Sequence, residues 1–266
     1  MPTSDQLQII HRAKDDAIRR RIRPPLPSQL PVEDELAVKA LLQKRGEIVA
    51  RYGKERVGDG DLDRLRPGMW LNDEIINFYG AMILGRSEAR KENPVKSNEK
   101  APLDIFYLSS FFYEKLTKLG YEKARLAKWT KKVDIFSKDA LLMPVNHNNS
   151  HWTAASINFR KKRIESYDSM YMFNRHVFPV LRRYLEQEHM EKKKKPFDFT
   201  GWIDWAPEDT PRQENGFDCG VFTMHFLEAV SRGEDMFAFS QKDMPYLRRR
   251  MLAEIGSAQL RGGHYA

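Results

Sequence analysis

The chain of 266 residues contains a single cysteine, Cys219. One cysteine excludes an internal disulfide and an all-cysteine metal cage, so we expect a reducing compartment such as the cytosol or nucleus. No apolar run approaches the roughly 20 residues that cross a bilayer, and the N-terminus is too polar for a secretory signal. These absences predict a soluble intracellular protein with no membrane insertion.

The composition provides enough apolar residues for one sizeable core. Hydrophobic residues make up 41% of the chain and aromatic residues 11%, which predicts one main domain with an N-terminal extension. The net charge of +8 arises from 45 Lys and Arg against 37 Asp and Glu, a mixed surface with a basic excess. Nucleic-acid binding needs basic residues gathered on one face beside stacking aromatics, and the sequence shows no such grouping. We therefore expect no specific nucleic-acid partner.

Residues 1–55 differ in composition from the rest of the chain. A basic block runs into prolines over Arg19–Pro27, a pattern that favours an extended arm. This block has two interpretations, a nuclear-import signal or partner contact and a merely solvated arm. Apolar spacing predicts a helix over Val32–Tyr52, with acidic residues at its start. We therefore divide the chain into an arm with a helix (1–55) and a main domain (56–266).

The remaining pattern changes from helical to strand periodicity and back. Helices are predicted from Asn72 or Asp73 onward, over Phe106–Leu119 with a stop at Gly120, and over Val177–Gln187 and Asp243–Gln259. Strands are predicted at Leu141–Val145, Trp152–Phe159, Arg163–Tyr167 and Phe197–Trp205. The polar turn Arg160–Arg163 predicts a hairpin, and Glu88–Lys100 and Lys192–Lys195 are expected to be exposed loops. The whole is an α+β pattern.

The stretch that contains Cys219 passes from a turn into an apolar helical pattern. Asp218 is predicted to cap that helix, which places Cys219 in its first turn, where free N–H groups and the helix dipole favour a thiolate. An isolated cysteine is also commonly a buried small hydrophobe. The presence or absence of catalytic partner residues for Cys219 must therefore decide between the two interpretations. His225 lies too far along the helix to reach the thiol, so we assign it to the core or the surface.

A cysteine nucleophile needs a base, a group that orients the base, and donors for the oxyanion. His151 begins one predicted strand and Asp168 ends the next. If these strands form the hairpin, both side chains lie at the same end of it. Gln213 precedes Cys219 on the same loop, so its amide can face the oxyanion together with the Cys219 backbone N–H. The sequence predicts that these four residues form a catalytic site.

Each candidate also has an ordinary structural interpretation. His147 and His151 could be two metal ligands, but Asn-Asn-Ser between them resists a helix and no third ligand is evident. Taken singly, Asp168 is an ordinary turn residue and Gln213 a solvated amide. Because His147 and His151 have no third ligand, we expect no metal site.

Blocks along the chain, in this order, resemble the Ulp/SENP-type SUMO proteases. They are Trp70-Leu-Asn-Asp, Ser110-Phe-Phe-Tyr, Trp129-Thr-Lys-Lys-Val-Asp, His151-Trp, Tyr167-Asp-Ser and Gln213-x-Asn-Gly-x-Asp-Cys-Gly. The similarity runs from about residue 58 to about residue 260. It implies a papain-like cysteine protease fold, in which helices flank a central mostly antiparallel or mixed sheet and the nucleophile lies at a helix N-terminus.

The resemblance also implies roles for individual residues. It makes Cys219 the nucleophile, His151 the general base, Asp168 its orienting group and Gln213 the oxyanion donor. Three further residues match substrate-binding positions: Trp70 and Trp152 correspond to tryptophans that enclose the Gly-Gly tail of the modifier, and Asp73 to a carboxylate that grips the modifier's body.

The function implied is a SUMO-specific thiol peptidase and isopeptidase that needs no cofactor. Its partners would be SUMO and SUMO-conjugated proteins, and we expect a monomer in the nucleus or at the nuclear periphery, with the cytosol possible. Three alternatives stay open: a protease for another ubiquitin-like modifier such as NEDD8, an acyltransferase, and a non-catalytic SUMO-binding module. The Trp129 block favours SUMO. The ubiquitin-like Leu260-Arg-Gly-Gly is interpreted as a coincidence, because no ubiquitin-like pattern precedes it.

Overall fold

A computed structural model describes residues 25–92, 102–172, 175–234 and 236–261, and its centre is a mixed five-stranded sheet. The strands are β3 (Ile105–Tyr107), β4 (Ala140–His147), β5 (His151–Asn158), β6 (Arg163–Tyr167) and β7 (Ile203–Trp205). Their spatial order follows the chain. The pairs β4–β5 and β5–β6 are antiparallel, whereas β3 pairs with β4 and β6 with β7 in parallel. The predicted hairpin around Arg160–Arg163 is confirmed.

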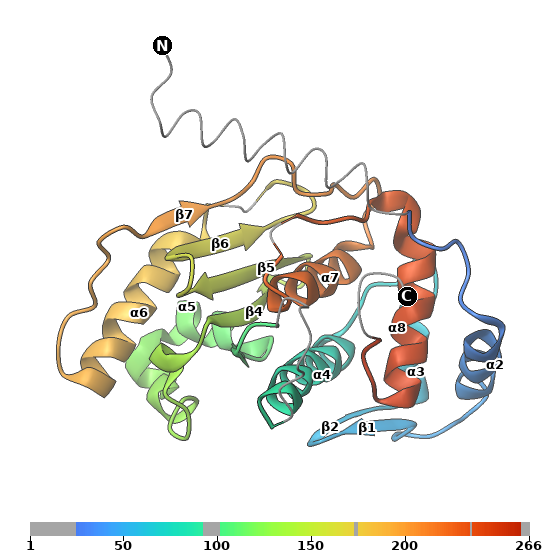
Figure 1. The fold of residues 1–266 in the computed structure, drawn as a ribbon. Coiled ribbons are helices and arrows are strands. Elements are labelled where there is room, and N and C mark those ends of the chain that lie inside the picture. The colour runs from blue at the N-terminus through green and yellow to red at the C-terminus, as the bar shows by residue number, and fades with distance from the viewer. Residues whose placement is uncertain (1–24, 93–101, 173–174, 235, 262–266) are drawn as a thin grey trace, which may run out of the picture.

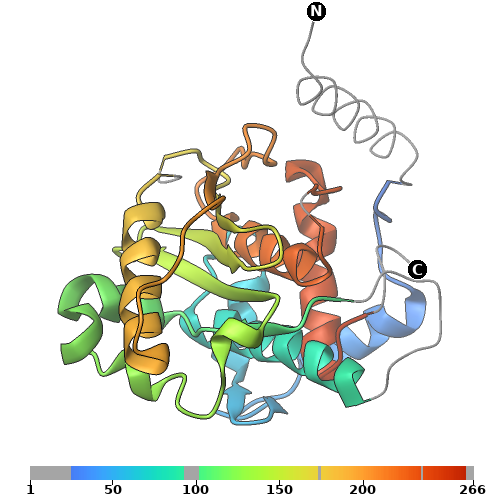
Figure 2. The ribbon, with the colours of Figure 1, turned by 60° about the vertical axis from the view of Figure 1, so that its left-hand side comes forward.

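The sheet is covered by helices on both faces (Figures 1 and 2). One face carries α4 (Asp73–Glu92) and α7 (Cys219–Ser231), with α8 (Met244–Ser257) packed against them. The other face carries α5 (Phe111–Lys123) and α6 (Val177–Lys193). Alternate residues of β4 feed the two cores, because Leu142 packs on the first side and Leu141 and Met143 on the second. The predicted α+β arrangement, a mixed sheet flanked by helices, is confirmed.

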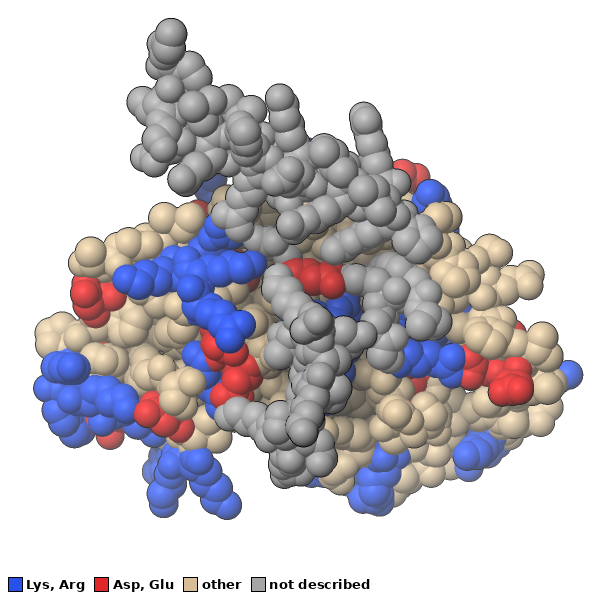
Figure 3. Space-filling model, in the orientation of Figure 1, with Lys and Arg blue, Asp and Glu red and all other residues tan. Residues whose placement is uncertain are grey.

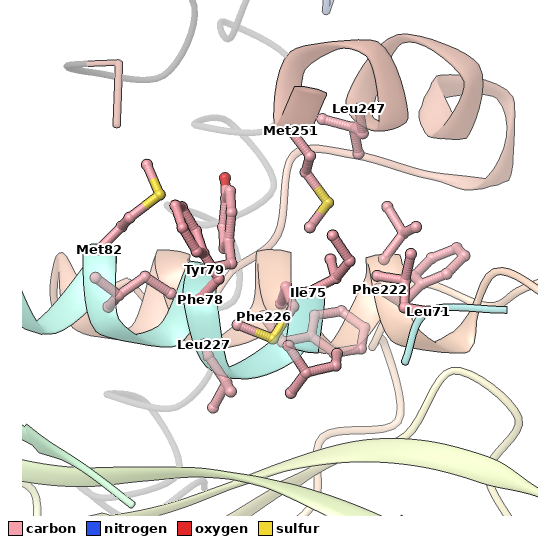
Figure 4. Packing of buried hydrophobic residues seen from close by; sticks show 14 of the residues in the cluster. Leu71, Ile75, Phe78, Tyr79, Met82, Phe222, Phe226, Leu227, Leu247 and Met251 are labelled. Carbon is pink, nitrogen blue, oxygen red and sulfur yellow. The ribbon is translucent and has the colours of Figure 1, made fainter. Parts of the chain in front are cut away.

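The core on the α7 side brings three distant segments together. Figure 4 shows α4 and α7 lying alongside each other, with Leu247 and Met251 of α8 above them. Ile75, Phe222 and Phe226 are fully buried between these helices. This core fixes the first turn of α7, and therefore Cys219, against the sheet.

The predicted helix over Val32–Tyr52 is wrong in its second half. The helix α2 (Val32–Leu41) ends early, and a small antiparallel hairpin follows, made of β1 (Ala50–Tyr52) and β2 (Glu55–Val57). The run after Leu41 contains Gly46, whose φ of 128° is left-handed and interrupts a helix. The boundary that we placed after residue 55 falls inside this hairpin.

The helix α2 packs against α8 in both ribbon views and is held there by ion pairs (Figures 1 and 2). Arg249 of α8 binds Glu35, and Arg261 binds Asp34. Most of the basic block of the arm lies outside the described residues, so its interpretation stays a prediction.

Five short helices connect the larger elements in the part of the chain that the structure describes. They are α3 (Asp59–Leu62) with η1 (Asp63–Leu65), η2 (Leu126–Lys128), η3 (Ile135–Ser137) and η4 (Gln241–Asp243). None of the helices among the described residues is long and apolar enough to cross a membrane.

Other element boundaries also differ from the prediction. Residues 105–107 form β3, so the helix predicted from Phe106 begins only at Phe111. The predicted stop at Gly120 is a real break in the helix, since the φ of Gly120 is 77°, but helical residues resume after it and continue to Lys123. The helices α4 and α6 extend to Glu92 and Lys193, into segments predicted as loops; residues 93–100 of the first segment lie outside the described residues. Of the predicted strand Phe197–Trp205 only β7 forms, because its earlier aromatic residues pack into a ring cluster with Phe136 and Phe159.

Candidate active site

Cys219 is the first residue of α7 and is almost completely buried. The sequence predicted that Asp218 would cap this helix with its side chain. Asp218 does occupy the N-cap position, but its side chain makes no capping hydrogen bond. Its carboxylate is bound instead by Asn215, Gln241 and Arg248. The N–H groups of the first turn are therefore not used by this side chain and remain directed toward the start of the helix.

Gly220 lets the cysteine helix approach the segment that follows Trp70. A Cβ atom at Gly220 would lie 2.9 Å from the Leu71 Cβ and 3.0 Å from its Cγ, closer than ordinary carbon contacts allow. The Leu71 carbonyl accepts a hydrogen bond from Trp152 Nε1 at 3.2 Å. Leu71 is thus the point at which the cysteine helix, Trp152 and the Trp70 segment meet.

His151 and Asp168 lie together at one end of the β5–β6 hairpin, as the sequence predicted. His151 Nε2 is 2.6 Å from Asp168 Oδ1, and the exposed fractions of the two side chains are 2% and 0%. Asp168 follows the last residue of β6 directly, and its Oδ1 also accepts the backbone N–H of Met170 at 2.8 Å. The Met170 backbone N–H therefore orients the Asp168 carboxylate, and this carboxylate in turn orients the His151 imidazole.

The imidazole of His151 interacts with the Cys219 side chain as well as with Asp168. Because Asp168 occupies Nε2, Nδ1 is the ring nitrogen left for the sulfur. Burial lowers the pKa of His151, but its interactions with Asp168 and Cys219 outweigh burial and raise the pKa from 6.5 to about 9. At neutral pH the ring is therefore an imidazolium, which stabilises a thiolate beside it.

His147 lies against His151 but cannot share its role. The two rings stack with centroids 6.2 Å apart, and His147 Nε2 is 2.9 Å from Thr153 Oγ1. Burial and the positive charge of His151 lower the pKa of His147 to about 4, so it is neutral where His151 is charged. Among the residues that the structure describes, no three His, Cys, Asp or Glu side chains are grouped to hold a metal ion.

Gln213 joins the loop before Cys219 to the loop after Asp168. Its Oε1 accepts a hydrogen bond from Ser169 Oγ at 2.6 Å, and its Nε2 donates to the Asn215 carbonyl at 2.5 Å. An amide nitrogen has two N–H groups, so one remains for an oxyanion. The sequence predicted a role for Gln213 but none for Ser169 or Asn215, although both residues lie inside the blocks that carry the family resemblance.

The candidate substrate-binding residues differ in exposure. Trp70 is 40% exposed at the end of the loop before α4, whereas Trp152 is buried beside His151. Asp73 is the first residue of α4 and half-buried, and the Asn72 side chain accepts the N–H of Ile75 at 3.3 Å. His225, assigned to core or surface, is buried among the rings of Tyr79 and Phe239. The catalytic and substrate-binding roles of these residues stay predictions.

Comparison with known protein families gives one domain match. Residues 69–260 match the model described as "Ulp1 protease family, C-terminal catalytic domain". A sentrin-specific protease of Caenorhabditis elegans is 45% identical over 200 residues, which are 75% of this chain and 27% of that protein. Human sentrin-specific protease 2 is 34% identical over 216 residues, 80% of this chain and 34% of that protein. The chain thus spans about a third or less of the length of these curated relatives.

Solved structures show the same fold. The Ulp1 protease domain in complex with Smt3, the yeast orthologue of SUMO, is 26% identical with a TM-score of 0.69, and the match covers 90% of this chain and 100% of that one. The catalytic domain of a Chaetomium thermophilum Ulp1-like SUMO protease is 25% identical with a TM-score of 0.74, covering 90% of this chain and 96% of that one.

Proposed function

This chain belongs to the Ulp1 protease family, and from that premise we propose that it is a SUMO-directed thiol peptidase. It cleaves after the C-terminal Gly-Gly of SUMO and releases either a target lysine amine or a short propeptide. The relatives are named as sentrin-specific proteases, and one related domain is solved with a SUMO orthologue bound. SUMO and its conjugates are therefore the partners proposed for this chain.

One observation carries the proposal: a buried cysteine at a helix start interacts with an imidazole, and that imidazole is hydrogen-bonded to a buried carboxylate. In the proposed reaction the Cys219 thiolate attacks the glycine carbonyl carbon, and a C–S bond forms. The His151 imidazolium then gives its proton to the leaving amine as the C–N bond breaks. Water, deprotonated by the neutral His151, attacks the thioester carbonyl; the C–S bond breaks, the acid is released, and the Cys219 thiolate and His151 imidazolium are restored.

The oxyanion that forms during attack needs donors fixed before the reaction. The Cys219 backbone N–H and the second Nε2 N–H of Gln213 are proposed for this role. Gln213 is anchored at both ends of its amide, by Ser169 and Asn215. Such preorganisation lets the donors act without rearranging during the reaction.

The two indoles provide a reason for selectivity. Trp70 adjoins Leu71, and Trp152 of β5 is hydrogen-bonded to the Leu71 carbonyl, so the two tryptophans are connected through Leu71, which packs against Gly220 beside Cys219. We propose that a Gly-Gly tail passes between them, since residues without side chains need the least width. We propose that Asp73, at the start of α4 and half-buried, contacts the body of the modifier.

The basic surface does not favour a nucleic-acid function. In the face shown in Figure 3, Lys and Arg side chains gather toward the left-hand edge but alternate with Asp and Glu. Two of the basic residues of α6 are paired with carboxylates: Arg182 with Asp204 and Lys193 with Asp134, each at 2.7 Å. A nuclear location remains a proposal that depends on the basic block of the arm.

A panel of C-terminal electrophilic probes tests the proposal. SUMO, NEDD8 and ubiquitin, each with a reactive vinyl group in place of the last carboxylate, are incubated with the chain and the adduct is mapped by mass spectrometry. We expect a SUMO adduct on Cys219. Preferential labelling by NEDD8 or ubiquitin would reassign the substrate, and no labelling by any probe would favour a non-catalytic module.

A further inference from the structure

Arg248 of α8 is a buried cation beside the loop Gln213–Asp218, which precedes Cys219. Only 3% of its side chain is exposed. Its Nε donates to Asp218 Oδ1 at 2.8 Å, and its Nη2 lies 2.7 Å from the same oxygen. Because Asp218 immediately precedes Cys219, this ion pair fixes α8 to the residue at which the cysteine helix begins.

The same guanidinium also gathers four backbone carbonyls from two separate loops. Nη1 donates to the carbonyls of Arg64 and Arg66, each at 3.1 Å, and Nη2 to those of Met69 at 2.8 Å and Phe217 at 3.2 Å. Met69 adjoins Trp70 and Phe217 lies two residues before Cys219. One side chain therefore fixes the loop before the exposed indole to the loop before the sulfur.

Asp218 connects Arg248 through hydrogen bonds to Gln213, the proposed oxyanion donor. Its Oδ2 accepts Asn215 Nδ2 at 2.7 Å and Gln241 Nε2 at 2.8 Å. Asn215 Oδ1 accepts the backbone N–H groups of Phe217 and Asp218, and its carbonyl accepts the Gln213 amide. A continuous series of hydrogen bonds thus runs from Arg248 through Asp218 and Asn215 to Gln213.

The chemistry requires arginine at this position. The five N–H donors of a guanidinium lie in a fixed plane and satisfy several acceptors at once, whereas a lysine ammonium has three donors on a flexible stem. A buried ion pair seldom adds much net stability, so the arrangement is better explained by the geometry that it imposes. We propose that Arg248 is a positioning residue for the thiol peptidase function proposed above, which sets Gln213 and Trp70 relative to Cys219 without touching the substrate.

A double-mutant cycle tests this role, with Arg250→Met as the matched control. Arg250 lies on the same helix, is also buried, and pairs with Glu254 at 3.0 Å, away from the loop Gln213–Asp218. Cleavage of a SUMO C-terminal fluorogenic amide is measured at a temperature where every variant is folded. We expect Arg248→Met to lower kcat/KM about 10²-fold, because small misplacements of reacting groups cost about that much. Arg250→Met should lower the melting temperature but leave kcat/KM unchanged.

The cycle separates positioning from general destabilisation. In the wild-type and Arg250→Met backgrounds, Gln213→Ala should lower kcat/KM by about 10²- to 10³-fold. In the Arg248→Met background the same substitution should cost less than about 10-fold, since the amide is already misplaced. Full wild-type activity of Arg248→Met, or an undiminished Gln213→Ala effect in that background, would overturn the proposal.

A measurement that needs no substrate keeps the two proposals distinct. Backbone amide hydrogen exchange at Phe217 and Asp218 should be faster in Arg248→Met than in Arg250→Met, and equal rates would contradict the proposed role of Arg248. If wild-type protein fails to cleave SUMO, the proposed function fails while the exchange result still decides the role of Arg248. If Arg248→Met does not fold, Arg248→Lys replaces it, because it keeps the charge beside Asp218 but not the planar set of donors.

Discussion

Replacing Asp168 by asparagine should change the pH dependence of the reaction as well as its rate. The substitution keeps the size of the side chain but removes the negative charge 2.6 Å from His151 Nε2. Burial, which lowers the pKa of His151, is then opposed by Cys219 alone. The pKa should return from about 9 toward the ordinary value of 6.5.

The magnitude follows from the fraction of imidazolium at a given pH. At about pH 8, a group with a pKa of about 9 is about 90% protonated, and one with a pKa of 6.5 about 3% protonated. Their ratio predicts a loss of about 30-fold in kcat/KM at that pH. Near pH 6 both proteins carry the imidazolium, so the difference due to ionisation should nearly disappear.

The assay is the cleavage of a SUMO C-terminal fluorogenic amide across the pH range, together with NMR titration of the His151 ring. The wild-type rate should fall through an alkaline midpoint near 9, and the Asp168→Asn rate through one closer to 6.5. An unchanged alkaline midpoint in the variant would refute the assignment of Asp168 as the group that holds His151 charged.

Three further outcomes are expected. Cys219→Ala should abolish cleavage while leaving SUMO binding by calorimetry intact, and substantial turnover by this variant would exclude Cys219 as the nucleophile. Gly220→Ala should lower kcat/KM about 10-fold or more, because the added Cβ would press on Leu71. The control Gly256→Ala presses on Leu41, away from the site, and should leave kcat/KM unchanged. Equal effects of the two substitutions on kcat/KM would contradict this reasoning. The raised pKa of His151 should stabilise the fold fully below about pH 6.5, and this contribution should disappear as the pH rises through about 9. Urea unfolding of wild type and His151→Gln should therefore converge over that range, and a constant difference would contradict the raised pKa.

The strands that carry the site were predictable because their pattern is local. The β5–β6 hairpin joins two neighbouring strands through a short polar turn, and its register places His151 and Asp168 at the same end. The start of α7 at Cys219 was predictable for the same reason, since the change from turn to apolar spacing lies at Asp218.

The errors arose where tertiary contacts override local pattern. A three-residue strand such as β3 is too short for periodicity to reveal, and it exists because Ile105 and Tyr107 are buried against β4 and α4. Asp218 appeared to be a helix cap because aspartate commonly is one. Its actual partner, Arg248, lies 30 positions along the chain, and no pattern around Asp218 indicates which distant cation it binds.

The central claim is that the Cys219 sulfur attacks the carbonyl of the last glycine of SUMO. The most direct measurement is mass-spectrometric mapping of the adduct formed with a SUMO C-terminal vinyl electrophile, beside a His151→Gln control. We predict a single adduct on Cys219 whose formation is strongly slowed in the control. An adduct on another residue, or labelling that is indifferent to His151, would contradict the claim.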